Sequence, residues 1–480
     1  MEIVFLGHQS WLISEGKTNI LLDPVLSGGF GNKDDNDIEI YPPRKIDFST
    51  MPKIDAVILS HEHSDHFHIP TLNKFKDVPI VVGPLFVNCA QKIIQDHQLA
   101  INIIPFQVSH RIGSLEIILY PAGFDTVFWE SRVAQVFIRS VDNPNNSFFI
   151  AVDALVSVEF KEDIINEQID LPRVIAVSNN SQITPPGVLG SLDNFKVPNS
   201  TGNTPFIGLS ILKEVLHDYL EEIEEIENIV ICGGGFTKQY DTFFGAFPFS
   251  DQSKLAAIAN SLSINRKIFG PVPGQKIKID EEHVEYCPSQ ATWVQLDEQR
   301  LHQIAEAGEK YRKTLQVVEI KPVSQIKIPV DFSMLKNELN KMAKVFMLSH
   351  QGNLAIDYLA SKSEYYTPYG LVINFRENET SDKKLRYGLN FNSSEFELIN
   401  DYCEESTIPF GVELFLNDFL CIINGIIQIW DIGGIGLKSW YIGSKLNSPT
   451  AFLYSYYGEQ IHPILNYECY KKRWPIEKVG

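Results

Sequence analysis

Four histidines crowd into eight consecutive positions, and this cluster constrains the chain more than any other feature. They lie in the run 61–68, which reads HEHSDHFH, although the whole 480-residue chain has only 12 histidines. The preceding residues 54–60 are apolar and partly β-branched, which predicts a buried strand, and Pro70 lies near the start of an expected helix. The histidines therefore occupy a loop between a strand and a helix.

The spacing within this loop predicts two metal sites side by side. Residues i and i+2 of an extended chain point to the same side, so His61 and His63 can reach one metal ion together. The chain then bends into the helix, which directs Asp65 and His66 toward a neighbouring position. Unligated, neighbouring imidazoles would repel one another on protonation, which argues against a surface loop that is histidine-rich by chance. His68 falls outside the spacing and is expected at the surface or beside a ligand.

Composition limits the kinds of partner that the chain can have. A net charge of −19 argues against binding to nucleic acid or to an anionic membrane, because both repel an acidic surface. No stretch approaches the roughly 20 apolar residues that a membrane helix needs. The 6 cysteines are scattered, which favours a reducing compartment, and the first residues do not resemble a signal peptide. We therefore expect a cytoplasmic protein.

The order of the expected elements predicts an α/β fold. Strands in two sets, with helices between and outside them, indicate a layered αββα sandwich. The clearest helix covers 211–228, and its acidic face is expected to be solvated. The strand 228–232 follows, and the glycine run 233–235 after it is expected to form a tight turn near the mouth of the site rather than a phosphate cradle.

A change of composition in the run 321–329, KPVSQIKIP, predicts a domain boundary. We expect a catalytic domain at 1–315, a linker at 316–330 and a smaller α+β domain at 331–480. In that last part, residues 411–455 predict an apolar helix followed by strands around the tryptophans at 430 and 440.

The loop at 61–66 has the His-x-His-x-Asp-His form of the metallo-β-lactamase superfamily, and its surroundings also resemble that family. The opening segments 5–13 and 19–24 are similar to the first hairpin of the branch that includes ascorbate-phosphate lactonases. Residues 59–83 and 270–280 are similar to the metallo-β-lactamase-like part of CMP-N-acetylneuraminate hydroxylase. The resemblance implies the αββα metallo-β-lactamase sandwich over about the first 290 residues.

The resemblance also implies a set of metal ligands. It assigns His61 and His63 to the first site and Asp65 and His66 to the second, with Asp153 bridging both metal ions. Asp65 would in addition hold the reactive water and accept its proton, which makes it the expected catalytic residue.

Two more residues are expected beside these ligands. Asp23, in an Asp-Pro step, matches an acid that orients a ligand imidazole through a hydrogen bond. His8 would lie near the site as a partner of a ligand or as a substrate contact, and a structural role for it stays open.

Two histidines of the family pattern are absent from this chain. A third first-site histidine should follow a Pro-Ala-x step, but here 121–123 leads to Phe124 and Asp125. A late histidine should complete the second site, but that region holds Phe247 and a proline. We expect Asp125 to be the substitute ligand, with His110 or a site with fewer ligands as alternatives. A carboxylate here resembles the diiron hydroxylase of chloramphenicol biosynthesis.

Three functions remain open. With two Zn²⁺ or Mn²⁺ ions the protein would be a hydrolase that uses metal-bound hydroxide on a small-molecule ester, lactone, amide or phosphoester. With iron it would be a diiron oxygenase, since extra carboxylate ligands favour harder, oxidisable metals. That oxygenase would need an external reductase, because no Rieske-type Cys/His pair accompanies the domain. A degenerate binding protein is the third reading.

The C-terminal domain carries no chemical cluster of its own. Its segment 411–455 resembles the sterol-carrier-like domains appended to other members of the superfamily. Such a domain would supply an apolar substrate pocket or the contact of a homodimer.

Overall fold

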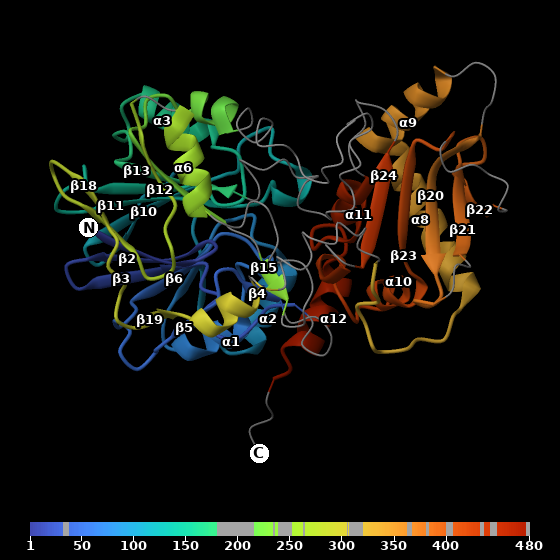
Figure 1. Ribbon diagram of the computed structural model, residues 1–480, viewed down its shortest axis with the longest axis horizontal. Helices are drawn as coiled ribbons and strands as arrows, with labels where there is room; N and C mark the ends of the chain where they lie inside the picture. Colours follow the sequence, from blue (N-terminus) through green and yellow to red (C-terminus); the bar gives the residue numbers. More distant parts are fainter. Residues whose placement is uncertain are drawn as a thin grey trace.

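The protein folds into two domains that lie side by side, with helices α11 (Pro449–Tyr457) and α12 (Pro463–Arg473) at their junction (Figure 1). The computed structural model describes residues 1–31, 38–179, 216–233, 236–238, 252–262, 265–304, 306, 320–361, 367–380, 384–399, 407–432, 436–441 and 449–476.

Two mixed β-sheets face each other in the N-terminal domain. Apolar side chains such as Trp11, Phe148 and Ile150 fill the space between them. The first sheet has the order β18 (Val284–Cys287), β17 (Lys276–Ile279), β1 (Glu2–Gly7), β2 (Ser10–Glu15), β3 (Thr18–Leu22), β6 (Ala56–Leu59), β7 (Ile80–Val82) and β8 (Ile101–Ile103). The second has the order β16 (Lys267–Phe269), β14 (Asn228–Cys232), β13 (Val174–Ser178), β12 (Ser147–Ile150), β11 (Gln135–Ser140), β10 (Leu115–Tyr120) and β9 (His110–Ile112).

Helices cover the outer face of each sheet, as Figure 1 shows with α3 and α6 above and α1 and α2 below. Parallel strands covered on both faces are buried throughout, which is why β6, β12 and β13 read as unbroken apolar runs. This arrangement confirms the predicted αββα sandwich. The helical elements are α1 (Ile69–Leu72), η1 (Asn73–Phe75), α2 (Asn88–Asp96), η2 (Phe128–Glu130), α3 (Val158–Ile165) and α6 (Gln252–Leu262).

Two short strand pairs lie outside the main sheets: β4 (Ile38–Ile40) with β15 (Phe236–Lys238), and β5 (Arg44–Ile46) with β19 (Val294–Leu296). The guanidinium of Arg44 donates to the carbonyl oxygens of Leu6 and Val25. Arg44 thereby ties this segment to the chain on either side of β2 and β3.

The helix predicted at 211–228 is shorter at its C-terminal end than expected. Of its described part, residues 216–221 are helical, and turns follow up to β14. Four glutamates between 221 and 225 lie where the negative end of the helix dipole disfavours acidic side chains, which accounts for the early end. The glycines at 234–235 and the Phe-Pro pair at 247–248 lie outside the described residues.

The C-terminal domain packs helices against one five-stranded sheet, whose core includes Leu339, Phe346, Phe375 and Val412. Trp440 lies on a strand as expected, but Trp430 lies on a 3-10 turn and not on a strand. The sheet has the order β22 (Glu395–Leu398), β21 (Lys384–Asn390), β20 (Tyr369–Arg376), β23 (Phe410–Phe415) and β24 (Leu437–Tyr441). The helical elements are α8 (Phe332–Leu348), α9 (His350–Ala360), α10 (Leu416–Ile423), η7 (Ile429–Ile432), α11 and α12.

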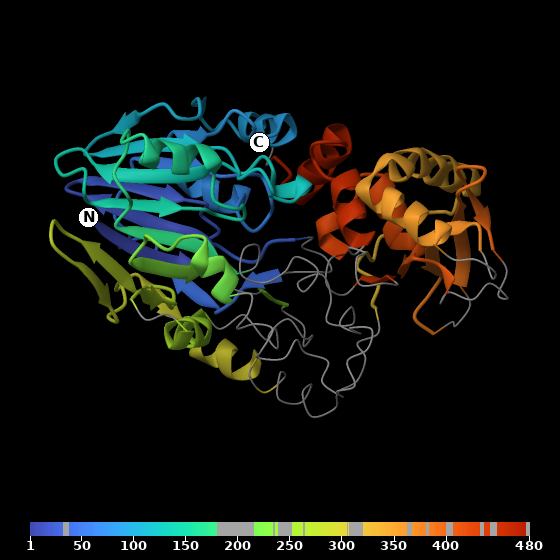
Figure 2. The same ribbon diagram turned by 90° about the horizontal axis from the view of Figure 1, so that it is seen from above.

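The last helix returns to the N-terminal domain. Tyr470 and Trp474, at the end of α12, pack with Phe67 and Phe86 in the outer core of the first sheet. Tyr467 on α12 also donates from its hydroxyl to Asp96 at the end of α2. Figure 2 shows α12 between the two domains in a second view. A division of the chain at residue 331 therefore separates the sheets but cuts through a shared core.

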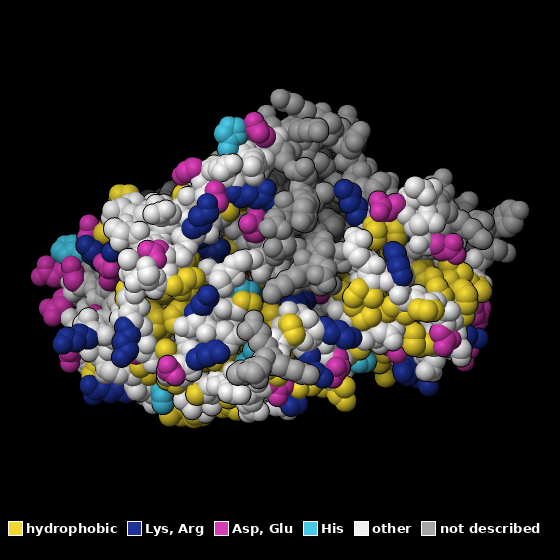
Figure 3. Space-filling view, turned by 90° about the horizontal axis from the view of Figure 1, so that it is seen from below, with side chains coloured by type: hydrophobic (Ala, Val, Ile, Leu, Met, Phe, Trp, Pro, Cys, Tyr) yellow, Lys and Arg dark blue, Asp and Glu magenta, His cyan; other side chains and the backbone are white. Residues whose placement is uncertain are grey.

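Figure 3 shows one face of the molecule, with lysine and arginine side chains spread among acidic ones and apolar side chains gathered over the C-terminal domain. On the described part of this face the basic side chains form no continuous patch. Among the described residues, no helix combines the length and the apolar character needed to cross a bilayer.

Candidate metal centre

The histidine-rich loop is buried at the edge where the two sheets meet. It follows β6 directly, and the side chains of His61 and His66 have no exposed surface. The backbone N–H groups of His66 and Phe67 both donate to the carbonyl of His63, which bends the loop back toward the helix. This bend places two groups of potential metal ligands side by side, with His61 and His66 in ring contact between them.

The first group consists of His61, His63 and Glu130. His61 Nε2 lies 3.5 Å from Glu130 Oε2, and His63 Nδ1 lies 3.3 Å from Glu130 Oε1. Burial lowers the pKa of both histidines well below the usual value, so both imidazoles are neutral and carry a lone pair. Burial, with the charge of Asp153 nearby, raises the pKa of Glu130.

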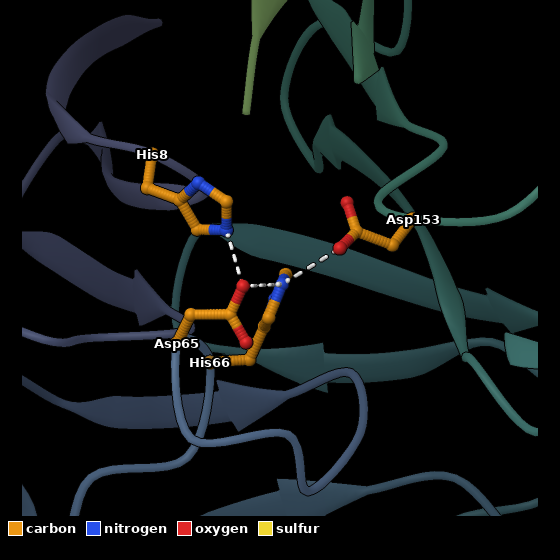
Figure 4. Close-up of side chains that lie close together, drawn as sticks. All are labelled: His8, Asp65, His66 and Asp153. Atoms are coloured by element: carbon orange, nitrogen blue, oxygen red, sulfur yellow. Dashed lines mark hydrogen bonds and ion pairs between the residues drawn. The ribbon is translucent and has the colours of Figure 1, made fainter. Parts of the chain in front are cut away.

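The second group consists of His8, Asp65, His66 and Asp153, which point toward one another from three separate segments (Figure 4). Asp65 Oδ2 lies 3.0 Å from His8 Nε2 and 3.7 Å from His66 Nε2, and Asp153 Oδ2 lies 3.1 Å from His66 Nε2. Burial alone would lower the pKa of His66, but the carboxylates of Asp65 and Asp153 raise it well above the usual value. Burial likewise opposes ionisation of these carboxyls, yet His66 lowers the pKa of each.

Asp23 determines which ring nitrogen each of His61 and His66 turns toward the site. Its Oδ2 lies 2.8 Å from His66 Nδ1 and accepts from the Ser60 hydroxyl at 2.5 Å, and that hydroxyl oxygen lies 2.9 Å from His61 Nδ1. Because Ser60 donates to the carboxylate, its oxygen accepts from His61. Both histidines therefore carry a hydrogen on Nδ1 and turn Nε2 toward the site, which is the nitrogen that would bind a metal. The structure thus brings Asp23 to the place expected for it.

Asp153 is held by neighbours of its own sheet and of the first hairpin. Its Oδ1 accepts from Ser178 Oγ at 2.8 Å and from Gln9 Nε2 at 3.1 Å, which leaves Oδ2 toward His66. The preceding Val152 has φ +54°, a left-handed conformation that a β-branched residue rarely adopts. Strained backbone beside a cluster of ionisable groups is typical of a functional site.

The first group fits a metal ion. His61 Nε2 and Glu130 Oε2 are buried and face each other, yet neither has a hydrogen-bond partner among the described residues. Buried polar atoms almost always have partners, so two that converge without one fit a site for a cation. Imidazole nitrogens with carboxylate oxygens are a donor set that suits Zn²⁺, Mn²⁺ or iron.

Comparison with known families agrees with this geometry. Residues 2–153, which contain the histidine loop and end at Asp153, match the family model described as a beta-lactamase superfamily domain. The matched segment of the N-terminal domain therefore resembles the metallo-β-lactamase superfamily. The match covers the first hairpin, the loop and Asp153, but it ends before the second half of the sandwich.

The curated relatives match short stretches of the chain. The chain is 29% identical over 120 residues to the cytidine monophosphate-N-acetylneuraminic acid hydroxylase of Cricetulus griseus, which is 23% of this chain and 21% of that protein. It is 32% identical over 85 residues to a UPF0173 protein of Pyrococcus furiosus, which is 18% of this chain and 31% of that protein. The chain thus spans about a fifth to a third of the length of these relatives.

Solved structures of metallo-β-lactamase-fold proteins are more distant. An isothiocyanate hydrolase from Delia radicum gut bacteria has 15% identity and a TM-score of 0.39, covering 58% of this chain and 99% of its own. A diiron beta-hydroxylase from Streptomyces venezuelae has 13% identity and a TM-score of 0.37, covering 59% of this chain and 54% of its own. Likenesses at this level do not distinguish between reactions.

The structure does not bring Asp125 to the histidines. Asp125 is exposed in the turn after β10, beside a Phe124 that is also exposed, and none of the ligand groups among the described residues includes it. Glu130 takes the expected place, because the turn continues into η2 and carries this acid back to His61 and His63. The sequence holds only one weak signal for Glu130, its position directly after the apolar run at 127–129.

The structure also places three other histidines that the sequence singles out. His8 lies near the site as expected, whereas His68 and His110 do not lie where they were expected. His8 lies within the second group, at the position where an additional ligand or substrate contact can act. His68 is buried rather than on the surface, with Nδ1 2.8 Å from Thr71 Oγ1 and its ring against Trp474. His110, the alternative ligand, lies on β9 and joins none of the ligand groups of the described chain.

Proposed function

We propose that this protein is a metal-dependent enzyme that holds two divalent ions and hydrolyses a small-molecule ester, lactone, amide or phosphoester. The observation that carries the proposal is the pairing of two buried ligand groups, one of which leaves His61 Nε2 and Glu130 Oε2 facing each other without partners among the described residues. Similarity to the metallo-β-lactamase superfamily supports it, because the residues that match the family model include the loop and Asp153.

In this proposal each group holds one ion. His61, His63 and Glu130 would hold the first. Asp65, His66 and Asp153 would hold the second, with His8 beside them. When bound, such ions lower the pKa of water to about 7 and stabilise negative charge on an oxygen of the substrate. The carboxylate at position 130 favours Mn²⁺ or iron over Zn²⁺ in the first site.

Asp65 is the group best placed to move a proton. Its side chain is 15% exposed, whereas those of His66 and Asp153 are 0% and 4% exposed. A carboxylate that faces the site and also reaches solvent can accept a proton from the attacking water and release it outward. His8 Nε2, 3.0 Å from Asp65 Oδ2, orients that carboxylate.

A diiron oxygenase is the second candidate, and Glu130 is the observation that favours it. Three carboxylates, from Asp65, Glu130 and Asp153, surround the two sites, and oxygen ligands suit oxidisable iron better than zinc. In this candidate the electrons come from an external reductase. The role of the C-terminal domain as a sterol-carrier-like pocket or a homodimer contact stays a prediction.

Metal reconstitution distinguishes the two candidates. Chelated protein is reloaded separately with Zn²⁺, Mn²⁺ and Fe²⁺, and its bound metal and its activity on a panel of esters, lactones, amides and phosphoesters are measured under nitrogen and in air. A hydrolase regains activity under nitrogen, and Asp65→Asn abolishes it while the exposed-site control Asp170→Asn does not. Activity restored only by iron, with oxygen and a reductant, would establish the oxygenase. Uptake of no metal would refute both.

A further inference from the structure

A small pocket lies at the end of the N-terminal domain opposite the metal centre. Arg173, Asn228 and Lys267 line it from the N-terminal ends of the parallel strands β13, β14 and β16. Glu282 and His283 line it from the turn between β17 and β18. Figure 1 shows β18 at the left end of the N-terminal domain, away from the junction with the C-terminal domain. Both sheets of the sandwich therefore contribute to the pocket.

The parallel strands separate this pocket from the metal centre. Strand β13 begins directly after Arg173 and ends at Ser178, whose hydroxyl donates to Asp153. The 5 residues of β13 span about 16 Å, at roughly 3.3 Å per residue, so a small ligand in the pocket does not reach the metal ligands. What the pocket binds is therefore independent of the proposed metal chemistry.

The inner wall of the pocket presents hydrogen-bond donors. Nε of the half-buried Arg173 is itself buried and has no hydrogen-bond partner, and its guanidinium makes no ion pair with the described residues. Backbone hydrogen bonds lower the pKa of Asp280 in the nearby turn, and the charge of Arg173 adds to this effect without an ion pair. Asn228 is 7% exposed, and its Oδ1 accepts from the Tyr286 hydroxyl at 3.4 Å, which leaves the NH₂ group available. Unpaired donors on a cation fit a carboxylate.

The acidic side chains of the pocket lie at its exposed rim. Glu227, Lys267 and Glu282 are all exposed. Apart from the histidine, the lining thus has two cationic and two acidic side chains, with Arg173 deepest. The two glutamates would repel a ligand of net negative charge such as phosphate, whereas a ligand with separate positive and negative groups pairs with both kinds of side chain.

The size of the pocket limits the ligand to a small molecule. Its volume is about 150 Å³, below the roughly 300–1,000 Å³ of pockets that bind drug-sized ligands. A nucleotide or a folded peptide segment is too large for this space. A molecule of the size of a single amino acid is the class that remains.

We propose that this pocket binds a small zwitterion of the amino-acid class. Its carboxylate lies against Arg173 and Asn228, and its ammonium group lies against Glu227 and Glu282 at the rim. The ligand is neither the substrate nor a cofactor of the proposed reaction, because it binds at the other end of β13. Its binding stabilises the folded chain, because strands far apart in the sequence form the pocket only in the folded state.

The test measures the binding of defined small molecules to the full-length protein by calorimetry and by melting temperature. Glycine, L-alanine and L-serine are compared with acetate, methylamine and inorganic phosphate, each of which carries charge of one sign. The variants Arg173→Gln and Glu227→Gln each remove one charge from the pocket. The control Arg111→Gln removes an exposed arginine from β9 of the same sheet, which does not line the pocket.

We expect at least one of the three amino acids to bind at a single site and to raise the melting temperature. It should bind about tenfold or more tightly than acetate or methylamine, because contacts to both charged groups act together. Arg173→Gln should weaken this binding by about tenfold or more, and Glu227→Gln should weaken the amino acid but not acetate. The control Arg111→Gln should bind as the wild type does.

Three outcomes would overturn the proposal. They are acetate or phosphate binding as tightly as the amino acids, amino-acid binding that survives Arg173→Gln, and no binding at millimolar concentration. Amino acids bound at the metal centre would give the second outcome, so the Arg173 variant separates the two sites. The melting temperature of each variant without ligand shows whether it folds, and Glu227→Gln decides the matter if Arg173→Gln does not.

Discussion

Replacing Asp23 by Asn tests whether one buried carboxylate sets the metal-binding form of two histidines. Asp23 has no exposed surface and accepts three hydrogen bonds, from the Ser60 backbone N–H at 2.8 Å, the Ser60 hydroxyl at 2.5 Å and His66 Nδ1 at 2.8 Å. The residue has φ +43°, a conformation that asparagine tolerates about as well as aspartate, so the change alters charge and donors without adding backbone strain.

The expected loss follows from counting the donors. An amide has one oxygen and one NH₂ group, so in either orientation at least one of the three donors meets another donor. One unpaired buried group costs about 1–3 kcal/mol, which is the expected fall in the free energy of unfolding. If the NH₂ group faces His66, the ring turns its lone pair to Nδ1 and loses it at Nε2. Metal affinity at the second site should then fall by about tenfold or more.

The assay combines urea unfolding of the metal-free protein with metal titration. The control is Asp163→Asn, because Asp163 is also buried and accepts from the Tyr120 hydroxyl at 2.8 Å, but it belongs to no ligand group among the described residues. Asp163→Asn should lower stability without changing metal binding. Asp23→Asn protein that binds two ions with wild-type affinity would refute the reasoning about Asp23.

Four further outcomes are expected. Glu130→His should raise the preference of the first site for Zn²⁺ over Mn²⁺, measured by competition between the two ions, since imidazole replaces a hard oxygen ligand. Removal of metal by a chelator should lower the melting temperature. The difference in melting temperature between metal-loaded and chelated protein should grow with the metal concentration, because the ions bind the folded state alone. Residues 1–330 expressed alone should be less stable than the full chain, measured by solubility and thermal unfolding, because Tyr470 and Trp474 leave the core around Phe67. Burial, with Glu62 nearby, raises the pKa of Glu459 to about 7. The contribution of Glu459 to the free energy of unfolding is therefore fully present below about pH 4.5 and is lost as the pH rises through 7. In urea unfolding, Glu459→Gln should make the free energy of unfolding less dependent on pH over that range.

The residues of the histidine loop could be predicted from the sequence, because their arrangement depends on residues that are neighbours in the chain. The spacing of His61, His63, Asp65 and His66 after an apolar strand is a local pattern, and the strand β6 and the bend of the loop follow from it. These residues could be assigned because a short motif fixes both the element and the direction of the side chains. Asp153, shortly after β12, was assigned through the family resemblance instead.

Glu130 could not be assigned in this way. Its position depends on how far the turn after β10 travels before it returns to the loop, and on the pairing of Arg132 with Glu62 two residues later. Asp125 lies nearer in sequence to the family position, but sequence proximity carries no information about the path of an irregular segment. The burial of His68 has the same origin, because its neighbour Trp474 comes from the far end of the chain.

The residues that support the two ligand groups come from different parts of the chain. This difference explains why the second group was easier to predict from the sequence. Asp23, which contacts His66, and Gln9 and Ser178, which contact Asp153, come from strand ends and the first hairpin of the sandwich. His63 instead contacts Arg132, whose other neighbour Glu459 belongs to the C-terminal domain. No local pattern can reveal this contact, because Glu459 lies far along the chain from the loop and reaches it only when both domains are folded.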